Sequence, residues 1–498
     1  MDIEAFRHFG HRIVDWVADY RAKVGRGELP IAPRVVPGDV KGKLPAVPPE
    51  APEPLDNVLH DLTEIVLPAC MHSQDARFFG HFPSVSSLSG VIGEYVNLGL
   101  AQLGVSWQTS PALTELEEVV VDWLRQMLGL SAAWSGATQD TATTGILLAM
   151  LCARDRATGL APDSDFQDSD KRLVAYASAH CHESVDKAAR LVGIGRKGLR
   201  VVPVDEAFAL SPDALEEMIA FDVDRGLRPC AVVATIGTAN TTALDPLAEI
   251  CRVARSWNLW VHVDAAMAGA AMILPECRWM WEGIEDADSM SFNPHKWLGA
   301  PFDCSTYFTR HPQHLVNVMG SDSRHLGHAV PQPKSFRDWG IQTTRQHRAL
   351  KLWFLIREQG VVGLQARIRR DLAHARWLAA QIDAAPDWRQ LAPCPLQTVC
   401  ARHEPPGLTG HALDAHTLAW IRRINISGSA YLTPVRLQGR WAARVAFGGE
   451  ATERHHVAAL WEAMRIEAGA RQPAGQSARR RPPQDERSRE QLARPEAT

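Results

Sequence analysis

Apolar residues near the N-terminus recur at steps of three and four positions, with polar residues between them. This spacing predicts a helix over residues 2–24 with one apolar face. A single helix cannot bury such a face alone, so we expect it to pack on a second copy of the chain or on its own body. The positions on this face are Ile3, Phe6, Gly10, Ile13, Val17, Tyr20 and Val24.

Short apolar runs alternate with helical stretches through the middle of the chain. This alternation is typical of an α/β fold, in which a mainly parallel sheet has helices on its faces. Ligands of such sheets bind at the carboxyl ends of the strands. The apolar runs are 173–177, 201–204, 231–236, 259–263, 289–292 and 305–308, and the helical stretches are 183–192, 212–220 and 246–256.

Other segments have their own signatures. Residues 29–54 are rich in proline and predict an extended linker, whereas 55–67 and 110–128 have helical patterns, the second with Ser110 as its cap. Residues 310–338 lack periodicity and predict a functional lid or mobile loop. Further expected elements are helices over 346–358 and 377–382 and strands over 396–402 and 441–447.

These patterns divide the chain into four parts. They are an N-terminal helical segment (1–85), a large domain (86–385), a small α+β domain (386–469) and a tail (470–498). The tail is rich in Arg, Gln, Pro and Glu and almost lacks large apolar residues, so we expect it to be disordered.

The composition limits the classes of partner that we expect the protein to bind. The formal net charge is −4 and the pI is about 6.6, which gives no electrostatic footprint for nucleic acid. The apolar run 145–153 is too short to cross a bilayer, and the N-terminus has no basic region followed by an apolar run. Nine dispersed cysteines without a Cys-x-x-Cys pair indicate reduced thiols. We expect a cytoplasmic protein without membrane or nucleic-acid partners.

Two side chains suggest the chemistry. Lys296 follows the turn Asn293-Pro294-His295 after one apolar run, and Asp264 ends another. A lysine can form a Schiff base with an aldehyde cofactor, and an aspartate can hold a proton on a pyridine nitrogen. Taken singly, the lysine could lie on the surface and the aspartate could cap a helix. Together, at the ends of two strands, they predict a site for pyridoxal phosphate.

Two further features suit the same cofactor. Thr141, Ala142 and Thr143 stand at a helix start, where free backbone N–H groups and hydroxyls can bind a phosphate. His182 follows another apolar run and can stack on a flat ring, although alone it reads as an ordinary loop histidine. No residue in this set calls for a metal.

Longer motifs now point to a family. The chain resembles the PLP-dependent group II amino acid decarboxylases, of the aromatic-L-amino-acid decarboxylase family, from about residue 2 to 466. The resemblance implies an aspartate-aminotransferase-like fold (fold type I) with a mainly parallel seven-stranded sheet. It also implies a homodimer in which the N-terminal helical segment wraps around the partner. The matching motifs are Ser106-Trp107, Ser110-Pro111-Ala112, Thr114-Glu115-Leu116-Glu117, His262-Val263-Asp264-Ala265-Ala266, Asn293-Pro294-His295-Lys296-Trp297, Phe302-Asp303-Cys304, Phe336-Arg337-Asp338-Trp339 and Arg348-Ala349-Leu350-Lys351-Leu352-Trp353-Phe354.

The resemblance also implies residue roles. Lys296 is the Schiff-base lysine, Asp264 is the partner of the pyridine nitrogen, and His182 stacks on the ring. The other implied cofactor contacts are Thr141, Ala142, Thr143, Thr238, Ala266, Asn293 and His295. The implied substrate contacts are Phe82, Ser84, Leu103, Val105 and His182.

The chain departs from the family in four places. Asp140-Thr141-Ala142-Thr143-Thr144 stands where the family has Gly-Ser-Ala-Ser-Glu, and the hydroxyls that can bind a phosphate are kept. His325 stands where the family lid carries a tyrosine that returns a proton to the reaction intermediate, and histidine can also act as an acid. Ala239 replaces a threonine, so one cofactor contact is lost or passes to Thr238 or Asn240. Val105 and His81 replace aromatic residues of the pocket, and the smaller Val105 leaves room for a larger ring such as indole.

Three functions remain open at this point. The first is decarboxylation of an L-amino acid, most simply an aromatic one, to an amine and carbon dioxide, with His325 joining Lys296 and His182 in catalysis. The second is an oxygen-dependent aldehyde synthase, the route taken by relatives that have phenylalanine at the position of His325. The third is an idle binding protein with this fold, which would have no chemical need for Lys296, Asp264 and His182 together.

Overall fold

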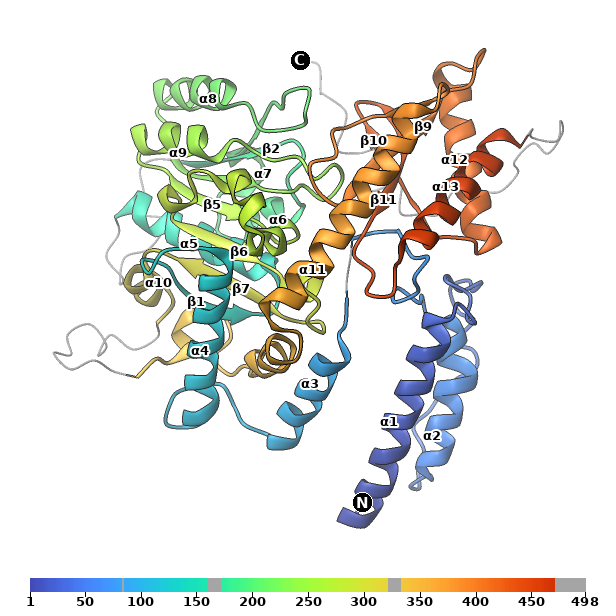
Figure 1. Ribbon diagram of the computed structural model, residues 1–498. Helices are drawn as coiled ribbons and strands as arrows, with labels where there is room; N and C mark the ends of the chain where they lie inside the picture. Colours follow the sequence, from blue (N-terminus) through green and yellow to red (C-terminus); the bar gives the residue numbers. More distant parts are fainter. Residues whose placement is uncertain (83–84, 160–171, 321–332, 471–498) are drawn as a thin grey trace.

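A seven-stranded sheet forms the centre of the computed structural model, which describes residues 1–82, 85–159, 172–320 and 333–470. The strand order is β1-β7-β6-β5-β4-β2-β3 (Figure 1). All neighbouring pairs are parallel except those made by β7, which runs antiparallel to β1 and β6. The strands are β1 (Ser135–Gln139), β2 (Leu173–Ser178), β3 (Leu199–Val202), β4 (Arg228–Thr235), β5 (Trp260–Asp264), β6 (Ser289–Phe292) and β7 (Ser305–Thr309).

Both faces of this sheet are buried, which explains why its central strands read as continuous apolar runs. Val261 and Met290 pack in one hydrophobic cluster with α4, α8 and α9, whereas Trp260 packs in another with α5, α6 and α10. The covering helices are α4 (Pro111–Leu128), α5 (Ala142–Thr158), α6 (Ser184–Leu191), α7 (Gly195–Gly198), α8 (Pro212–Asp224), α9 (Leu247–Ser256) and α10 (Pro312–Met319).

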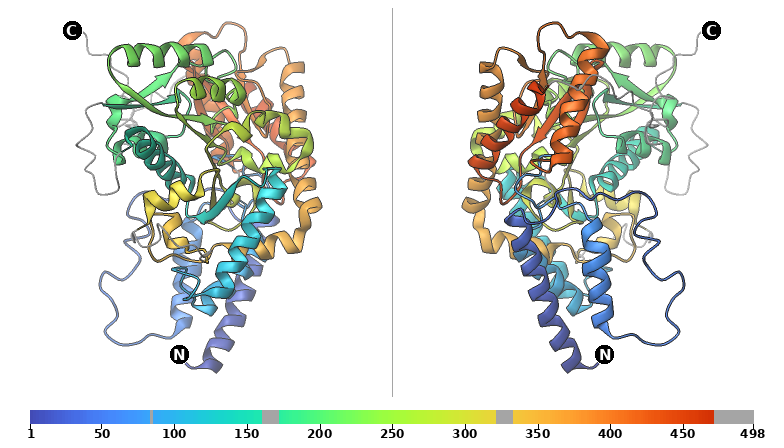
Figure 2. Two further views of the ribbon diagram at one scale, coloured as in Figure 1. Left: turned by 90° about the vertical axis from the view of Figure 1, so that its left-hand side faces the viewer. Right: turned by 90° about the vertical axis from the view of Figure 1, so that its right-hand side faces the viewer.

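The N-terminal helices project from this body. Helix α1 (Ile3–Gly25) lies beside α2 (Leu55–Asp61), which continues as a π turn over 62–66 and a 3₁₀ turn over 67–69 (Figures 1 and 2). The indole Nε1 of Trp16 donates to Oγ1 of Thr63 at 3.0 Å and joins the two. Helix α3 (Leu88–Leu100) then leads into the large unit.

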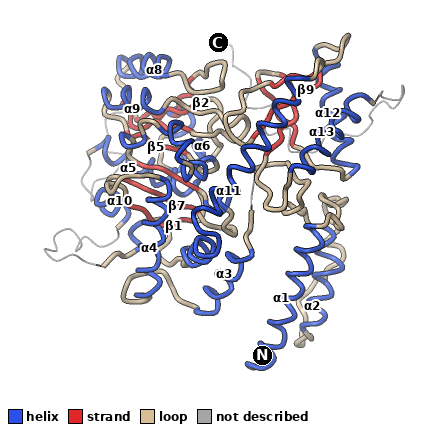
Figure 3. Tube along the Cα trace, viewed as in Figure 1, coloured by secondary structure: helices blue, strands red, loops and turns tan. Residues whose placement is uncertain are grey.

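The C-terminal part forms a second sheet, connected to the first by the long helix α11 (Ala349–Ala384) (Figure 3). Gly360 interrupts α11 with a φ of +63° and a ψ of 167°. The second sheet is antiparallel, in the order β10-β11-β9-β8, and α12 and α13 pack on it with α11. These elements are β8 (Trp388–Gln390), β9 (Thr398–His403), α12 (Gly410–Ser427), β10 (Thr433–Leu437), β11 (Arg440–Ala446) and α13 (Arg454–Gly469).

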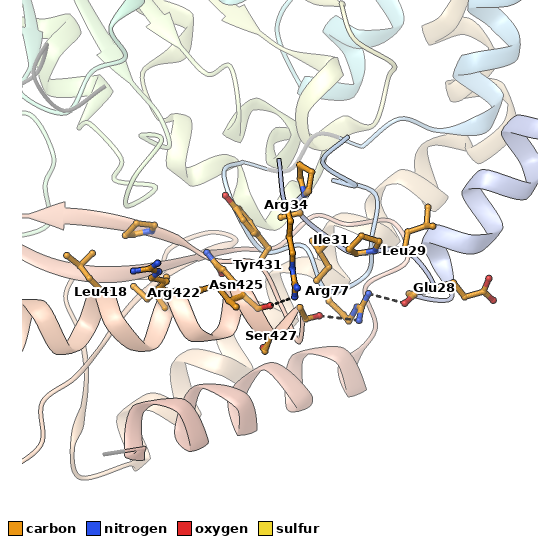
Figure 4. Close-up of a pocket in the computed structure, with 18 residues that line it drawn as sticks. Glu28, Leu29, Ile31, Arg34, Arg77, Leu418, Arg422, Asn425, Ser427 and Tyr431 are labelled. Carbon is orange, nitrogen blue, oxygen red and sulfur yellow. Dashed lines mark hydrogen bonds between the residues drawn. The ribbon is translucent and has the colours of Figure 1, made fainter. Parts of the chain in front are cut away.

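Two arginines tie the N-terminal linker to the C-terminal unit (Figure 4). Arg77 donates to the carbonyl oxygens of Gly27 and Gly428, each at 3.3 Å, and Arg34 donates to that of Ile426, also at 3.3 Å. Ile426 and Gly428 stand at the C-terminal end of α12, where free carbonyls attract cations. The hollow of about 710 Å³ around them is therefore a structural junction in which Arg34 and Arg77 are already engaged.

The mainly parallel seven-stranded sheet confirms the predicted fold class. The expectation that 310–338 is irregular throughout is wrong, because α10 occupies Pro312–Met319. Leu315 is the buried residue of α10, and Val316, Val318 and Met319 pack partly buried on the same cluster. This apolar repeat is short, and it stands among His, Gly, Pro and Ser residues that conceal it. The division into four parts stays a prediction. Within the described residues, no helix is both long and apolar enough to cross a bilayer.

Candidate active site

A pocket of about 180 Å³ opens at the carboxyl ends of β4, β5 and β6. Asp264 is the last residue of β5, Lys296 lies in the turn after β6, and His182 lies just before α6. The predicted site residues that line the pocket are Phe82, Thr141, Ala142, Thr143, His182, Asp264, Ala266, Asn293, His295 and Lys296.

The turn that carries Lys296 is held from below by α11. Arg367 donates to the carbonyl oxygens of Trp297 and Leu298 at 2.9 and 2.6 Å, and the indole of Trp297 donates to Asp371 at 2.9 Å. The Nζ atom of Lys296 lies 4.6 Å from the centre of the Phe82 ring. Burial lowers the pKa of Lys296, and the negative charge of Asp264 opposes this shift. A larger neutral fraction favours attack of this amine on an aldehyde.

Asp264 is buried, and its Oδ1 accepts the amide N–H of Ala266 at 3.0 Å. A second carboxyl, Asp245, lies behind β4 and accepts the amide N–H groups of Thr235 at 2.7 Å and Leu210 at 2.8 Å. Burial raises the pKa of Asp245 to about 7, and the negative charges of Asp205 and Asp264 add to that shift. Asp264 is therefore the carboxylate in the pocket lining that could stabilise a protonated ring nitrogen, whereas Asp245, with its raised pKa, carries less negative charge near pH 7.

Two histidines present N–H donors. The Nδ1 of His182 accepts the amide N–H of Ser184 at 3.2 Å and lies 2.7 Å from its Oγ. The Nδ1 of His295 accepts the amide N–H of Cys304 at 2.9 Å. Because a backbone amide only donates, each neutral ring carries its proton on Nε2. Burial, and the neighbouring charge of Lys296, lower the pKa of His295 to about 4, so that ring is neutral at pH 7.

The start of α5 forms another wall. Thr141 precedes the helix in an extended conformation, and the helix begins at Ala142 with its first amides directed outward. Gly145 allows β6 to approach closely, since a Cβ atom there would lie 2.1 Å from the Oγ of Ser291.

Other predicted residues lie elsewhere. The hydroxyl of Thr238 is buried in its own turn, 2.9 Å from the Oγ1 of Thr241, and is not part of the pocket lining. Leu103 and Val105 belong to the loop between α3 and α4 and do not line this pocket either; Leu103 is 58% exposed. Ser84 and His325 lie outside the described residues.

Sequence reasoning did not assign a site role to several lining residues: Ser184, Thr235, Gly237, Met267 and Phe302. A usable signal existed for two of them. Ser184 opens a helix two positions after His182, and Phe302 belongs to a motif that matches the family. Ala239 also lines the pocket, and the loss of a cofactor contact there stays a prediction.

The family model described as the pyridoxal-dependent decarboxylase conserved domain matches residues 37–403. The chain belongs to the pyridoxal-dependent decarboxylases. It is therefore an enzyme of that class, and its cofactor is pyridoxal phosphate.

Individual relatives agree with the family. The tyrosine decarboxylase of Oryza sativa subsp. japonica is 38% identical to this decarboxylase over 93% of the chain and 90% of the relative. The phenylacetaldehyde synthase of Rosa hybrid cultivar is 34% identical over 94% and 95%. The solved structure of Catharanthus roseus tryptophan decarboxylase in complex with L-tryptophan has a TM-score of 0.89 and 32% identity, covering 94% of this chain and 98% of that one. These similarities confirm the resemblance to aromatic-L-amino-acid decarboxylases.

The residues around the pocket fit the family's cofactor. Within the described part of the chain, the buried Oγ1 of Thr235 and Oδ1 of Asn293 have no hydrogen-bond partner, although both residues line the pocket. Buried polar atoms of this kind are normally satisfied, so a polar ligand accounts for them. Thr141, Thr143 and Asn293 would hold the phosphate, Asp264 the ring nitrogen and Lys296 the aldehyde carbon.

Proposed function

We propose that this decarboxylase acts on an aromatic L-amino acid and releases the corresponding amine and carbon dioxide. The observation that carries the proposal is the convergence of Lys296, Asp264 and His182 on one pocket. Phe82 and Phe302 line the same pocket and offer ring surfaces to an aromatic side chain. Two of the relatives are named as a tyrosine decarboxylase and a tryptophan decarboxylase, and these names support the same substrate class.

Each residue has a distinct task in this reaction. Pyridoxal phosphate, when bound, supplies an electron-accepting ring. The carboxylate of Asp264 would keep the ring nitrogen protonated, and the amine of Lys296 would hold the cofactor aldehyde. His182, which lines the same pocket, would pack against the ring. The N–H of His295, held by Cys304, adds a fixed donor at the pocket wall.

A second outcome, oxygen-dependent formation of an aldehyde, is favoured by one observation. The phenylacetaldehyde synthase of Rosa hybrid cultivar is about as similar to this chain as the amine-forming relatives are. The residue that we expect to separate the two outcomes is His325, which would return a proton to the intermediate and so give the amine.

The proposal extends to assembly and location. We infer a homodimer, because Ile3, Phe6, Ile13 and Val14 of α1 are exposed apolar residues on a helix that projects from the body (Figure 2). We also infer a cytoplasmic enzyme, a location supported by the free state of all nine cysteines.

Turnover with a panel of L-amino acids tests the function. Tryptophan, tyrosine, phenylalanine and glutamate would be supplied with pyridoxal phosphate, and carbon dioxide, amine, aldehyde and peroxide would be scored together. We expect carbon dioxide and amine in equal amounts from an aromatic substrate and no peroxide. Equal amounts of aldehyde and peroxide would identify the synthase instead, and turnover of glutamate alone would contradict the substrate class. Lys296→Ala should abolish every product, whereas the exposed Lys187→Ala should change none.

A further inference from the structure

Arg444 on β11 reaches from the C-terminal sheet to two chain segments beside the active-site pocket. Its Nη1 donates to the carbonyl oxygen of Ala239 at 2.8 Å and to Oδ1 of Asn240 at 3.2 Å, and its Nη2 donates to the carbonyl oxygen of His81. Arg444 is only 6% exposed. One guanidinium therefore joins three parts of the chain that lie far apart in sequence.

The first of these segments ends in the wall that faces the reactive lysine. The amide of His81 donates to Oγ1 of Thr433 on β10 at 2.7 Å, so the C-terminal sheet holds both the N–H and the C=O of this residue. His81 has a φ of +49°, which is costly for a residue with a Cβ atom and persists where the surroundings impose it. The next residue is Phe82, whose ring lies 4.6 Å from Nζ of Lys296.

The preceding residues dock on the same sheet. The amide of Phe79 donates to the carbonyl oxygen of Tyr431, and that of Ala446 donates to the carbonyl oxygen of Phe79, both at 3.0 Å. The rings of Phe78 and Tyr431 stack at 5.2 Å. In Figure 1 this blue chain runs along the orange and red C-terminal unit before it reaches α3. These contacts fix the backbone path of the segment that leads to the turn at His81.

The second segment is the turn that contains Ala239, which also lines the pocket. The charge of Arg444 has no carboxylate within ion-pair distance in the described part of the chain, and its bonds go to backbone carbonyls and one amide side chain. A buried cation without an acid partner is expensive, so it is an inefficient way merely to join two sheets. The donors of Nη1 and Nη2 go to the segments beside the pocket, whereas the buried Nε has no partner within the described residues.

We propose that Arg444 is a positioning residue, which together with Thr433 sets Phe82 against Lys296 and holds Ala239 in the pocket lining. The C-terminal unit thereby controls the shape of the active-site pocket. The expected loss of kcat/KM rests on the proposed function. The expected loosening of the segments 77–82 and 237–243 does not. The displacement of a pocket wall by about 1 Å can cost roughly 100-fold in rate, because reacting groups lose their alignment.

Hydrogen exchange and kinetics on the full-length holoenzyme test the proposal. Arg444→Gln should leave the melting temperature and cofactor absorbance close to those of the parent and lower kcat/KM roughly 100-fold. Exchange should accelerate in 77–82 and 237–243 but not in α13. Arg444→Lys, which keeps one donor, should recover part of both losses. Arg436→Gln, at an exposed position on β10, is the matched control and should change neither the exchange rates nor kcat/KM.

Two results would overturn the proposal. The first is parental exchange and kcat/KM in Arg444→Gln. The second is an equal acceleration across the whole range 398–446, which would show that the arginine only stabilises its own sheet. If Arg444→Gln does not fold, Thr433→Val removes only the acceptor for the His81 amide and should still accelerate exchange in 77–82. Hydrogen exchange needs no substrate. It therefore tests the positioning role of Arg444 even if the amino acid panel contradicts the proposed function.

Discussion

The buried carboxylate of Asp264 lines the same pocket as Lys296. After the lysine itself, we expect the negative charge of Asp264 to matter most for catalysis. Asp264→Asn keeps the size of the side chain but cannot hold a proton on a ring nitrogen. We expect kcat to fall at least about 100-fold, the scale of losing one electrostatic stabiliser in an active site. Carbon dioxide release would measure the loss, and visible absorbance would show that cofactor is still bound. A fall of less than tenfold would contradict the role; the exposed Asp213→Asn is the control.

A second prediction concerns stability and pH. His262 on β5 is fully buried, and burial lowers the pKa of its imidazole to about 3. Between that value and the ordinary pKa near 6.5, the unfolded chain binds a proton that the folded one does not, so stability falls as pH falls through this window. The contribution is about 3 kcal/mol at pH 4.5 as an upper limit.

Replacing His262 by Phe should therefore flatten the loss of stability between pH 6.5 and 4.5. Urea unfolding at the two values would measure the change in the free energy of unfolding. The exposed His411→Gln should leave the slope as it is in the parent. A parental slope in His262→Phe would show that other groups cause the acid sensitivity.

The positions of Lys296, Asp264 and His182 were predictable from sequence because each follows a short run that reads as a buried strand. Strand ends of a parallel sheet meet at one edge, so their neighbours along the sheet follow from the fold class. The direction of Thr238 was not predictable, because it depends on hydrogen bonds inside its own turn. The loop position of Val105 was equally hidden, since no local pattern shows which side of a loop faces a cavity.

At the scale of elements, the interruption of α11 makes a paired prediction. Gly360 has backbone angles that only glycine adopts readily, and a Cβ atom there would meet nothing within 4 Å. Gly360→Ala should therefore lower the free energy of unfolding by about 1–3 kcal/mol through backbone strain alone. Gly363, in the regular part of the same helix, has ordinary space for a Cβ atom, so Gly363→Ala should raise it by about 0.5–1 kcal/mol.

Chemical denaturation of both variants would measure these opposite signs. Equal effects from the two alanines would mean that the angles at Gly360 are not needed by the fold. The sequence indicated two helices on either side of this residue but not their continuity, because a glycine can end a helix or redirect it.

Strand β1 shows a different limit of sequence reasoning. Its residues, Ser135–Gln139, are small or polar, and the predicted phosphate site drew attention only to the helix start that follows. The strand is nevertheless almost entirely buried, because α4 covers it and β7 pairs with it. Burial by packing with other elements leaves no trace in the strand's own residues, so an edge strand of this composition cannot be recognised by its own pattern.

At the scale of the whole molecule, the apolar face of α1 predicts the assembly. Phe6 is 52% exposed and Ile13 is 44% exposed. Phe6→Glu combined with Ile13→Glu should shift the proposed homodimer toward monomer, because charges would be forced into the inferred interface. Sedimentation equilibrium would measure the shift.

The matched control for this surface is Phe221→Glu on α8, an equally exposed phenylalanine at 59% on a different face. It should leave the association unchanged. A parental sedimentation profile in the α1 double variant would show that this helix is not part of the interface. Loss of association in Phe221→Glu would instead place the interface on the large unit.

The pairing of β1 with β7 governs how the protein is made. β7 is the strand partner of β1, and it is synthesised about 165 residues later, a delay of roughly 10–30 s at ribosomal speed. During that time β1 stands on the nascent chain without its strand partner, whereas α5 can pack on β4, β5 and β6 as they are made. The edge of the sheet that leads into the start of α5 can therefore be completed only when translation has passed Thr309, after the residues around Lys296. Newly made chains should depend on chaperones during this interval, and cofactor capture should follow the synthesis of β7 rather than that of Lys296.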